Sequence, residues 1–310
     1  MSVAQPRADS TDASPSGASP ADASPADASP ADGSPADRSP LTVGFIGAGS
    51  MGAPMVERLL AAGHAIHLYA RRSDVSARFT DLGAQLGSSA TAVAGAVDVL
   101  IVCPFSQAQL FEILVSGGAL AAMRPGSVLV QHATVSPTAV RELAAQAAAG
   151  EVAVLDAPVS GTSDSIRAGR LTVLVGGDKD AADLVEPLLG AYSATVVRTG
   201  EVGSASIVKL VNNLTFAAHV QTAIAADTLG RSLGLDTNLL MGALSVCSAN
   251  SAAIQALGIL GSPEAFAQFA LPYLRKDVAL IEQVAADLGL DVGLLGDIVR
   301  NGPAVLTGDS

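Results

Sequence analysis

The sequence predicts an α/β protein in which a doubly wound parallel sheet is followed by an all-helical region. Three observations support this prediction. Short apolar runs alternate with helix-like stretches between residues 41 and 200. These runs are apolar throughout rather than at every second position, which is typical of parallel strands covered on both faces. After Gly203 the strand-like runs stop, and one long helical stretch begins.

Six apolar runs, each bounded by Gly, Pro or polar residues, are the predicted strands. They occupy residues 41–46, 65–70, 97–102, 127–131, 152–155 and 171–175. Apolar residues at helical spacing predict helices between the strands and after them. These helices occupy residues 51–62, 77–82, 107–114, 137–149 and 181–189, and then 204–233, 238–244, 252–257 and 274–288.

The predicted domains follow from changes in this pattern. Residues 1–40 are rich in Ala, Ser, Pro and Asp, with an Ala-Ser-Pro-Ala-Asp repeat and few bulky apolar side chains. We expect a disordered tail there, either a spacer or docking segment or a tolerated extension. Residues 41–200 are expected to form the sheet domain and residues 201–310 the helical domain. A ligand cleft between the two domains is expected.

The composition restricts the partners of the protein. Hydrophobic residues make up 49% of the chain, which is enough for a substantial core. A formal net charge of -12 repels phosphate backbones and anionic lipids, so neither nucleic acid nor a membrane is expected as a main partner. The two cysteines are far apart and have no cluster of metal ligands, so we expect no metal site. Neither a membrane span nor a secretory signal is recognisable, and we expect a cytoplasmic protein.

A glycine-rich loop follows the first predicted strand and opens the first helix. Its sequence is Gly47-Ala48-Gly49-Ser50-Met51-Gly52, which fits the G-x-G-x-x-G pattern. In this context the first glycine permits a tight turn, the second lets a pyrophosphate approach, and the third lets helix and strand pack closely. The helix N-terminus offers free N–H groups to phosphates. The sheet is therefore predicted to be a Rossmann-type dinucleotide-binding domain.

The end of the second strand bears on the choice of cofactor. An NAD-selective site usually has Asp or Glu there to hold the ribose 2′-hydroxyl. Ala70 occupies that position, and Arg71, Arg72 and Ser73 follow it. Guanidinium groups favour a 2′-phosphate, so the sequence favours NADP, with NAD still possible. The alternative is that these side chains belong to a solvated loop.

A lysine and an asparagine stand four residues apart in the long predicted helix. Lys209 and Asn213 therefore share one helix face, and their neighbours in the sequence are largely apolar. Two polar groups on such a face need a polar cleft to point into. An ammonium group there could polarise a carbonyl oxygen and donate a proton to it as hydride arrives at the carbon. The alternative is a lysine that reaches the surface along its aliphatic stem.

Motifs along the chain resemble those of the 3-hydroxyacid dehydrogenase family. They are the glycine loop, Asp156-Ala157-Pro158-Val159-Ser160-Gly161, Gly200-x-x-Gly203-x-Ala205-x-x-x-Lys209-x-x-Asn212-Asn213, and Lys276-Asp277. The resemblance extends from Leu41 to about Ile281. It implies hydride transfer between NADP(H) and a small 3-hydroxy acid or semialdehyde, in a homodimer or homotetramer.

The resemblance also implies roles for single residues. Lys209 would be the general acid and base, and Asn213 would position it. Ser160 and Gly161 would hold the substrate carboxylate, and Thr162 stands where the family usually has a second glycine. Cofactor contacts would come from Cys103, Pro104, Thr134 and Lys276. The family usually continues through two full helices after Lys276, whereas this sequence ends at Ser310.

Two other functions stay open at the level of the sequence. An imine reductase would share the dinucleotide domain and the helical domain, but that group usually replaces the lysine. A module that binds NADP without turnover is the second alternative, and the intact lysine disfavours it.

Overall fold

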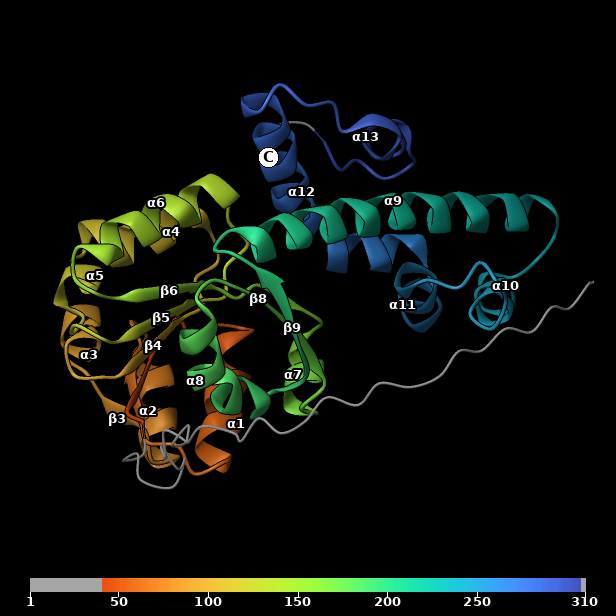
Figure 1. Cartoon of the computed structure of the whole chain (residues 1–310). Helices are drawn as coiled ribbons and strands as arrows, with labels where there is room; N and C mark the ends of the chain where they lie inside the picture. Colours follow the sequence, from red (N-terminus) through yellow and green to blue (C-terminus); the bar gives the residue numbers. More distant parts are fainter. Residues whose placement is uncertain (1–40, 308–310) are drawn as a thin grey trace, which may run out of the picture. The chain divides into compact units, whose positions relative to one another are not determined.

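The computed structural model describes residues 41–307 of the chain (Figure 1). Within this part the predicted fold class is confirmed, because a mostly parallel sheet flanked by helices comes first and helices alone follow it. The last strand ends at Gly200 and the next helix begins at Ser204. The domain boundary near residue 200 stays a prediction. The tail predicted to be disordered lies outside the described residues.

The described residues form a sheet of nine strands in the order β3-β2-β1-β4-β5-β6-β8-β7, with β9 paired to β8. The strands are β1 (Val43–Ile46), β2 (Ile66–Tyr69), β3 (Gln85–Leu86), β4 (Val99–Val102), β5 (Val128–Gln131), β6 (Ala153–Asp156), β7 (Val159–Ser160), β8 (Leu171–Gly176) and β9 (Ser193–Gly200). The pairs from β3 to β6 are parallel. Their carboxyl ends therefore share one edge, where ligands of such sheets bind.

The sheet differs from the prediction in two ways. Strand β8 runs antiparallel to both β6 and β7, so the sheet is mixed rather than fully parallel. Strands β3, β7 and β9 were not predicted. The first two have two residues each, and β9 is mostly exposed and rich in polar residues. None of the three has the continuous apolar run by which buried strands are recognised.

Helices cover both faces of the sheet, which explains its apolar strands (Figure 1). One apolar cluster joins α1 (Gly52–Ala61), α2 (Ser73–Asp81), α7 (Ser163–Arg167) and α8 (Lys179–Gly190) to one face. The other joins α3 (Ala90–Ala94), α4 (Gln107–Phe111), α5 (Ala119–Ala122) and α6 (Pro137–Ala148), with a π-helix at Glu112–Ser116, to the opposite face. In β4, Val99 and Ile101 belong to the first cluster, whereas Leu100 and Val102 belong to the second.

The helical part is built around one long helix, α9 (Ser204–Ser232). The helices α10 (Thr237–Leu244), α11 (Ala252–Leu260), α12 (Pro263–Asp287) and α13 (Gly293–Asn301) all pack against it. Helix α12 begins at Pro263 rather than at Leu274 as predicted, because Ser262 caps it and Pro263 occupies its first turn. Within residues 41–307, none of the helices combines the length and the hydropathy that a membrane crossing requires.

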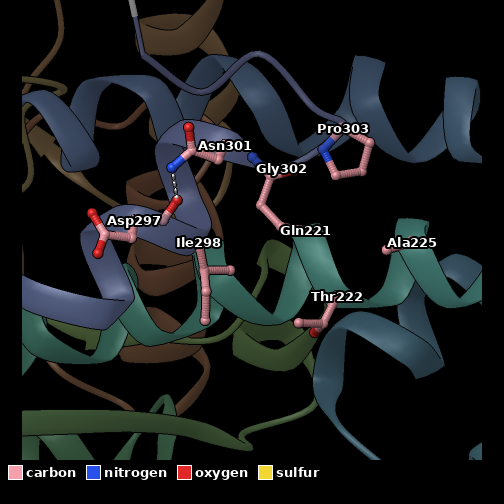
Figure 2. A pocket seen from close by; sticks show the side chains of 8 residues that line it. All are labelled: Gln221, Thr222, Ala225, Asp297, Ile298, Asn301, Gly302 and Pro303. Atoms are coloured by element: carbon pink, nitrogen blue, oxygen red, sulfur yellow. Dashed lines mark hydrogen bonds between the residues drawn. The ribbon is translucent and has the colours of Figure 1, made fainter.

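A buried glutamine ties the segment after α13 to α9. The Gln221 Nε2 group donates to the carbonyls of Val299 and Ala304 at 2.9 and 2.7 Å, and its Oε1 accepts from the N–H of Ala304 at 2.7 Å. Beside it a groove of about 410 Å³ lies between α9 and α13 (Figure 2). Its lining contains none of the residues predicted to bind cofactor or substrate.

Candidate functional site

The three glycines of the loop between β1 and α1 have different environments. At Gly47, with φ of +100°, a Cβ would lie 2.5 Å from the carbonyl oxygen of Cys103. At Gly52, a Cβ would lie 2.1 Å from the Gly47 carbonyl oxygen. A Cβ at Gly49 would meet no described atom within 4 Å. The outer two glycines are thus required by packing, and the middle one leaves open space for a ligand.

The other loop residues suit a dinucleotide. Ala48 and Met51 pack partly against the core, and Ser50 is exposed. Met51 makes no side-chain cap at the start of α1. The Ala53 N–H donates to the Gly49 carbonyl at 2.9 Å and Pro54 has no N–H, so the Gly52 N–H is the one in the first three positions of α1 that is available to an anion. The loop therefore fits the phosphates of the predicted cofactor.

The arginines after β2 lie at the surface. Arg71 and Ser73 are exposed. Arg72 precedes α2, and its guanidinium lies 3.0 Å from the carboxylate of Asp74, with both side chains largely in solvent. Arg71 is the less constrained of the two cations. This arrangement fits both the 2′-phosphate hypothesis and the solvated loop.

The segments after β4 and β5 end at the same edge of the sheet. Cys103 is half-buried, and its N–H donates to the carbonyl of Ile46 at 2.8 Å, directly beneath the glycine loop. Burial raises the pKa of the Cys103 thiol to about 12, so the thiol stays protonated. Pro104 and Thr134 are half-buried nearby in these two segments. Ser136, two residues after Thr134, caps α6.

A buried carboxylate fixes the start of α9. Asp156 ends β6 and is fully buried. Its two oxygens accept the N–H groups of Gly203 and Ser206, each at 2.8 Å. Burial raises the pKa of Asp156, while these two backbone bonds oppose the rise. The carboxylate satisfies one N–H just before α9 and one in its first turn, and it lies at the positive end of the helix dipole. The helix is thereby attached to the carboxyl edge of the sheet.

Lys209 and Asn213 lie in the first turns of α9, as their spacing predicts. Lys209 is half-buried and Asn213 is buried. The Asn213 Nδ2 donates to Oδ2 of Asp277 on α12 at 2.5 Å, and its Oδ1 accepts from Asn212 at 3.0 Å. The Lys276 ammonium lies 3.0 Å from Asp277 Oδ1. Asp277, to which the sequence assigned no function, is thus the centre of the cluster.

The electrostatics of the cluster act on Lys209. Burial lowers the pKa of the Lys209 ammonium, the Asp277 carboxylate raises it, and the neighbouring Lys276 lowers it. Burial is the largest of the three effects. A lysine whose pKa is lowered gives up its proton to a reacting oxygen more readily than an exposed lysine does.

An aromatic contact joins the two parts of the chain beside this cluster. Phe105, just after β4, packs edge-on against Tyr273 of α12 with ring centroids 6.2 Å apart. The Lys276 ammonium lies 5.3 Å from the centre of the Phe105 ring. The Lys276 side chain is therefore held between an aromatic face and the Asp277 carboxylate.

The predicted substrate-binding residues lie at the end of β7 and in the turn that follows it. Ser160 pairs with Thr172 of β8 and is half-buried. Gly161 has φ of +135°, and a Cβ there would lie 2.9 Å from a methyl group of Leu171. The Thr162 hydroxyl accepts the N–H of Ser165 at 3.3 Å and caps α7. Where the family usually has a glycine, the threonine therefore adds both bulk and a hydroxyl, whose oxygen caps the helix.

No group of three or more His, Cys, Asp or Glu residues is placed to hold a metal ion within residues 41–307. His132 is bonded to Ala157 and Tyr192, which leaves no free ring nitrogen.

Two family models match the chain. The one described as the NAD-binding domain of 6-phosphogluconate dehydrogenase covers residues 42–200. The one described as the NAD-binding of NADP-dependent 3-hydroxyisobutyrate dehydrogenase covers residues 203–300. These matches support a nicotinamide dinucleotide, NADP or NAD, as the cofactor.

Individual relatives agree with the family models. Human mitochondrial 3-hydroxyisobutyrate dehydrogenase is 35% identical over 207 residues, which are 66% of this chain and 62% of that enzyme. The match thus spans less than two thirds of the length of this relative. The structure of Mycobacterium tuberculosis 3-hydroxyisobutyrate dehydrogenase with L-serine is 26% identical, with a TM-score of 0.75 over 84% of this chain and 92% of that one.

Imine reductases share the fold more distantly. The enzyme from Myxococcus stipitatus is 18% identical, with a TM-score of 0.62 over 84% of this chain and 91% of that one. Its likeness extends to the fold alone.

Because the Asp156 carboxylate attaches α9 to the sheet, its removal should destabilise the protein. Asp156→Ala leaves the buried N–H groups of Gly203 and Ser206 without an acceptor. We expect the free energy of unfolding to fall by about 1–3 kcal/mol, measured by urea denaturation. Asp156→Asn keeps one acceptor oxygen and is expected to lose less. An unchanged unfolding midpoint in the alanine variant would contradict the role of Asp156 as the anchor of α9.

Proposed function

The chain belongs to the 3-hydroxyacid dehydrogenase family, and from this we propose that it transfers hydride between NADP(H) and a small 3-hydroxy acid or semialdehyde. Lys209 is proposed as the general acid and base. The single observation that carries the proposal is a half-buried ammonium whose pKa is lowered, in a cluster with Asn213 and Asp277, on the helix that Asp156 attaches to the sheet edge.

The residues at the carboxyl edge of the sheet would hold the cofactor. The loop from Gly47 to Gly52 would bind its phosphates, and the ends of β4 and β5, with Cys103, Pro104 and Thr134, would line the nicotinamide end. When bound, the cofactor supplies or accepts the hydride. The protein has to orient the substrate carbonyl, exclude water and move one proton at the carbonyl oxygen.

Lys209 moves this proton. In the direction of reduction, its ammonium donates to the carbonyl oxygen as the alcohol forms, and in oxidation the neutral amine takes the proton back. Asn213 would hold the amine in place, because its own amide is fixed by Asp277 and Asn212. Asp277 opposes the effect of burial on the pKa of Lys209 and so favours the protonated ammonium.

Ser160 and Gly161 are the proposed contacts of the substrate carboxylate. The Ser160 hydroxyl and the backbone N–H groups of the turn can donate to an anion. Thr162 adds bulk on this side of the site, and its hydroxyl oxygen caps α7. A small hydroxy acid such as 3-hydroxyisobutyrate or L-serine, named for the relatives, is the proposed class.

NADP is the proposed preference over NAD. Ala70 cannot hold a ribose hydroxyl, and Arg71 is exposed beside it. The family model over residues 203–300, described for an NADP-dependent enzyme, supports this preference.

A homodimer or homotetramer and a cytoplasmic location are further proposals. Several large apolar side chains of the helical part are more than half exposed, which supports association. They are Leu229, Leu233, Leu239, Val246 and Ile259.

A substrate panel is the most direct test of the reaction. NADPH oxidation is followed with small semialdehydes, keto acids and cyclic imines. We expect turnover of semialdehydes. Turnover of imines alone would favour an imine reductase, and NADPH binding without any turnover would favour a non-catalytic module.

Substitution of the lysine tests the mechanism. We expect Lys209→Ala to reduce kcat by about 10²- to 10⁴-fold while NADPH affinity stays unchanged. Lys209→Arg keeps the charge but cannot give up its proton near neutral pH, so we expect it to be equally inactive. Stopped-flow binding and steady-state rates separate the two effects. An arginine variant with the wild-type rate would show that only the charge matters.

The charges around Lys209 predict two opposite changes in the pH profile. Reduction requires the ammonium, so its rate falls as pH rises through the pKa of Lys209. Asp277→Asn removes the charge that raises this pKa, and we expect the alkaline limb of kcat/KM to move to lower pH. Lys276→Gln removes a charge that lowers it, and the limb should move to higher pH. A shift of both variants in the same direction would contradict this assignment.

The cofactor preference predicts the effect of Arg71→Ala. We expect NADPH affinity to fall about tenfold or more, because a charge-assisted contact to phosphate is lost, while NADH affinity stays within about twofold. Arg78→Ala is a matched control, since that guanidinium is partly exposed on α2 and pairs with Glu57. Equal weakening of both cofactors by Arg71→Ala would leave the solvated loop as the better explanation.

A further inference from the structure

A buried histidine joins three segments beneath the candidate site. His132 follows β5 and has 4% of its surface exposed. Its Nδ1 lies 2.5 Å from the carbonyl oxygen of Ala157, and its Nε2 lies 2.9 Å from the hydroxyl of Tyr192. The two rings meet edge-to-face with centroids 5.8 Å apart. Tyr192, between α8 and β9, is fully buried.

The protonation of the histidine follows from its partners. A carbonyl oxygen only accepts, so Nδ1 carries the hydrogen and donates to Ala157. Nε2 is then the acceptor of the Tyr192 hydroxyl. Burial lowers the pKa of His132 to about 4, so the ring is neutral at physiological pH and one tautomer persists.

The Ala157 carbonyl, which His132 contacts, lies in the chain between the Asp156 anchor of α9 and the proposed substrate residue Ser160. Ala157 follows Asp156, which anchors α9, and precedes the strand that carries Ser160. The Ala157 N–H donates to the Gln131 carbonyl at 2.8 Å, and the next carbonyl, of Pro158, accepts from Leu174 at 3.0 Å. Ala157 itself is fully buried. Without His132 its carbonyl would lose its side-chain donor in a place where water is excluded.

We propose that His132, held by Tyr192, is a positioning residue that fixes residues 157–160 and thereby aims Ser160 and Gly161 at the substrate carboxylate. This inference rests on the proposed function, because it assigns those two residues to the substrate. His132 touches neither the proposed reacting atoms nor Lys209. It acts through the backbone of the segment between the α9 anchor and the substrate turn.

Four variants of His132 and Tyr192, with one control variant, distinguish the positioning of residues 157–160 from a general loss of protein stability. His132→Leu removes both hydrogen bonds, and Tyr192→Phe removes only the hydroxyl. The double variant His132→Leu/Tyr192→Phe also removes the buried hydroxyl that the leucine would leave unpartnered. His132→Asn places an amide N–H where Nδ1 stood and serves as the conservative replacement. Leu257→Ala, a core truncation on α11, is a control for general destabilisation.

The expected result is a substrate effect without a cofactor effect. We expect His132→Leu and the double variant to raise KM for the hydroxy acid about tenfold, with the NADPH dissociation constant within about twofold of wild type. Compared with His132→Leu, the double variant should have a higher melting temperature but an equally raised KM. His132→Asn should have a KM close to that of wild type. Leu257→Ala should keep the wild-type KM although its melting temperature falls about as much as that of His132→Leu.

Amide hydrogen exchange gives a readout that needs no turnover. Residues 159–161 should exchange faster in His132→Leu than in wild type, and at the wild-type rate in Leu257→Ala. Unchanged exchange there, or a KM equal to wild type in the folded double variant, would overturn the proposal. If wild type turned over no hydroxy acid but the exchange result held, the proposed function would fail while His132 would still position the segment.

Discussion

One buried carboxylate connects the sheet to the helix that carries the proposed catalytic lysine. Asp156 ends a strand inside the sheet and accepts the N–H of Gly203, which precedes α9, and that of Ser206 in its first turn. An anion at this end of a helix is stabilised by the helix dipole and by hydrogen bonds that the helix cannot supply to itself. Everything proposed for Lys209 depends on this contact, because it decides where the second turn of α9 lies relative to the glycine loop.

The proposed reaction also depends on a balance of charges around one amine. In a protein with a net charge of -12, two ammonium groups, Lys209 and Lys276, lie near a single carboxylate, Asp277. That carboxylate bonds Asn213, pairs with Lys276 and opposes the effect of burial on Lys209. Contacts of Phe105 with Lys276 and Tyr273 add a link from the sheet to α12 at the same place. The residues proposed to control the proton transfer therefore lie at the same place where the sheet domain contacts α12.

Much of this arrangement was predictable from local patterns. The central strands are apolar on both faces, and the four-residue spacing of Lys209 and Asn213 put them on one helix face. Strand β9 was not predictable, because an edge strand buries little and its residues are mostly exposed. Asp277 was missed because its partner Asn213 is distant in sequence, whereas only its charged neighbours are visible locally. The use of the Thr162 hydroxyl as a cap likewise appears only with the fold.

The unbroken length of α9 has a mechanical consequence. At the rise of an α-helix, its 29 residues extend for about 43 Å, while Lys209 lies only about 9 Å from the Asp156 anchor. A rigid tilt of about 5° about that anchor would swing the far end by about 4 Å but move the lysine backbone by less than about 1 Å. The helices packed against the distal end of α9 can therefore change position substantially while the Lys209 amine stays close to its place in the site. The fixed point of α9 is therefore close to Lys209, and the larger displacements occur at the distal end of the helix.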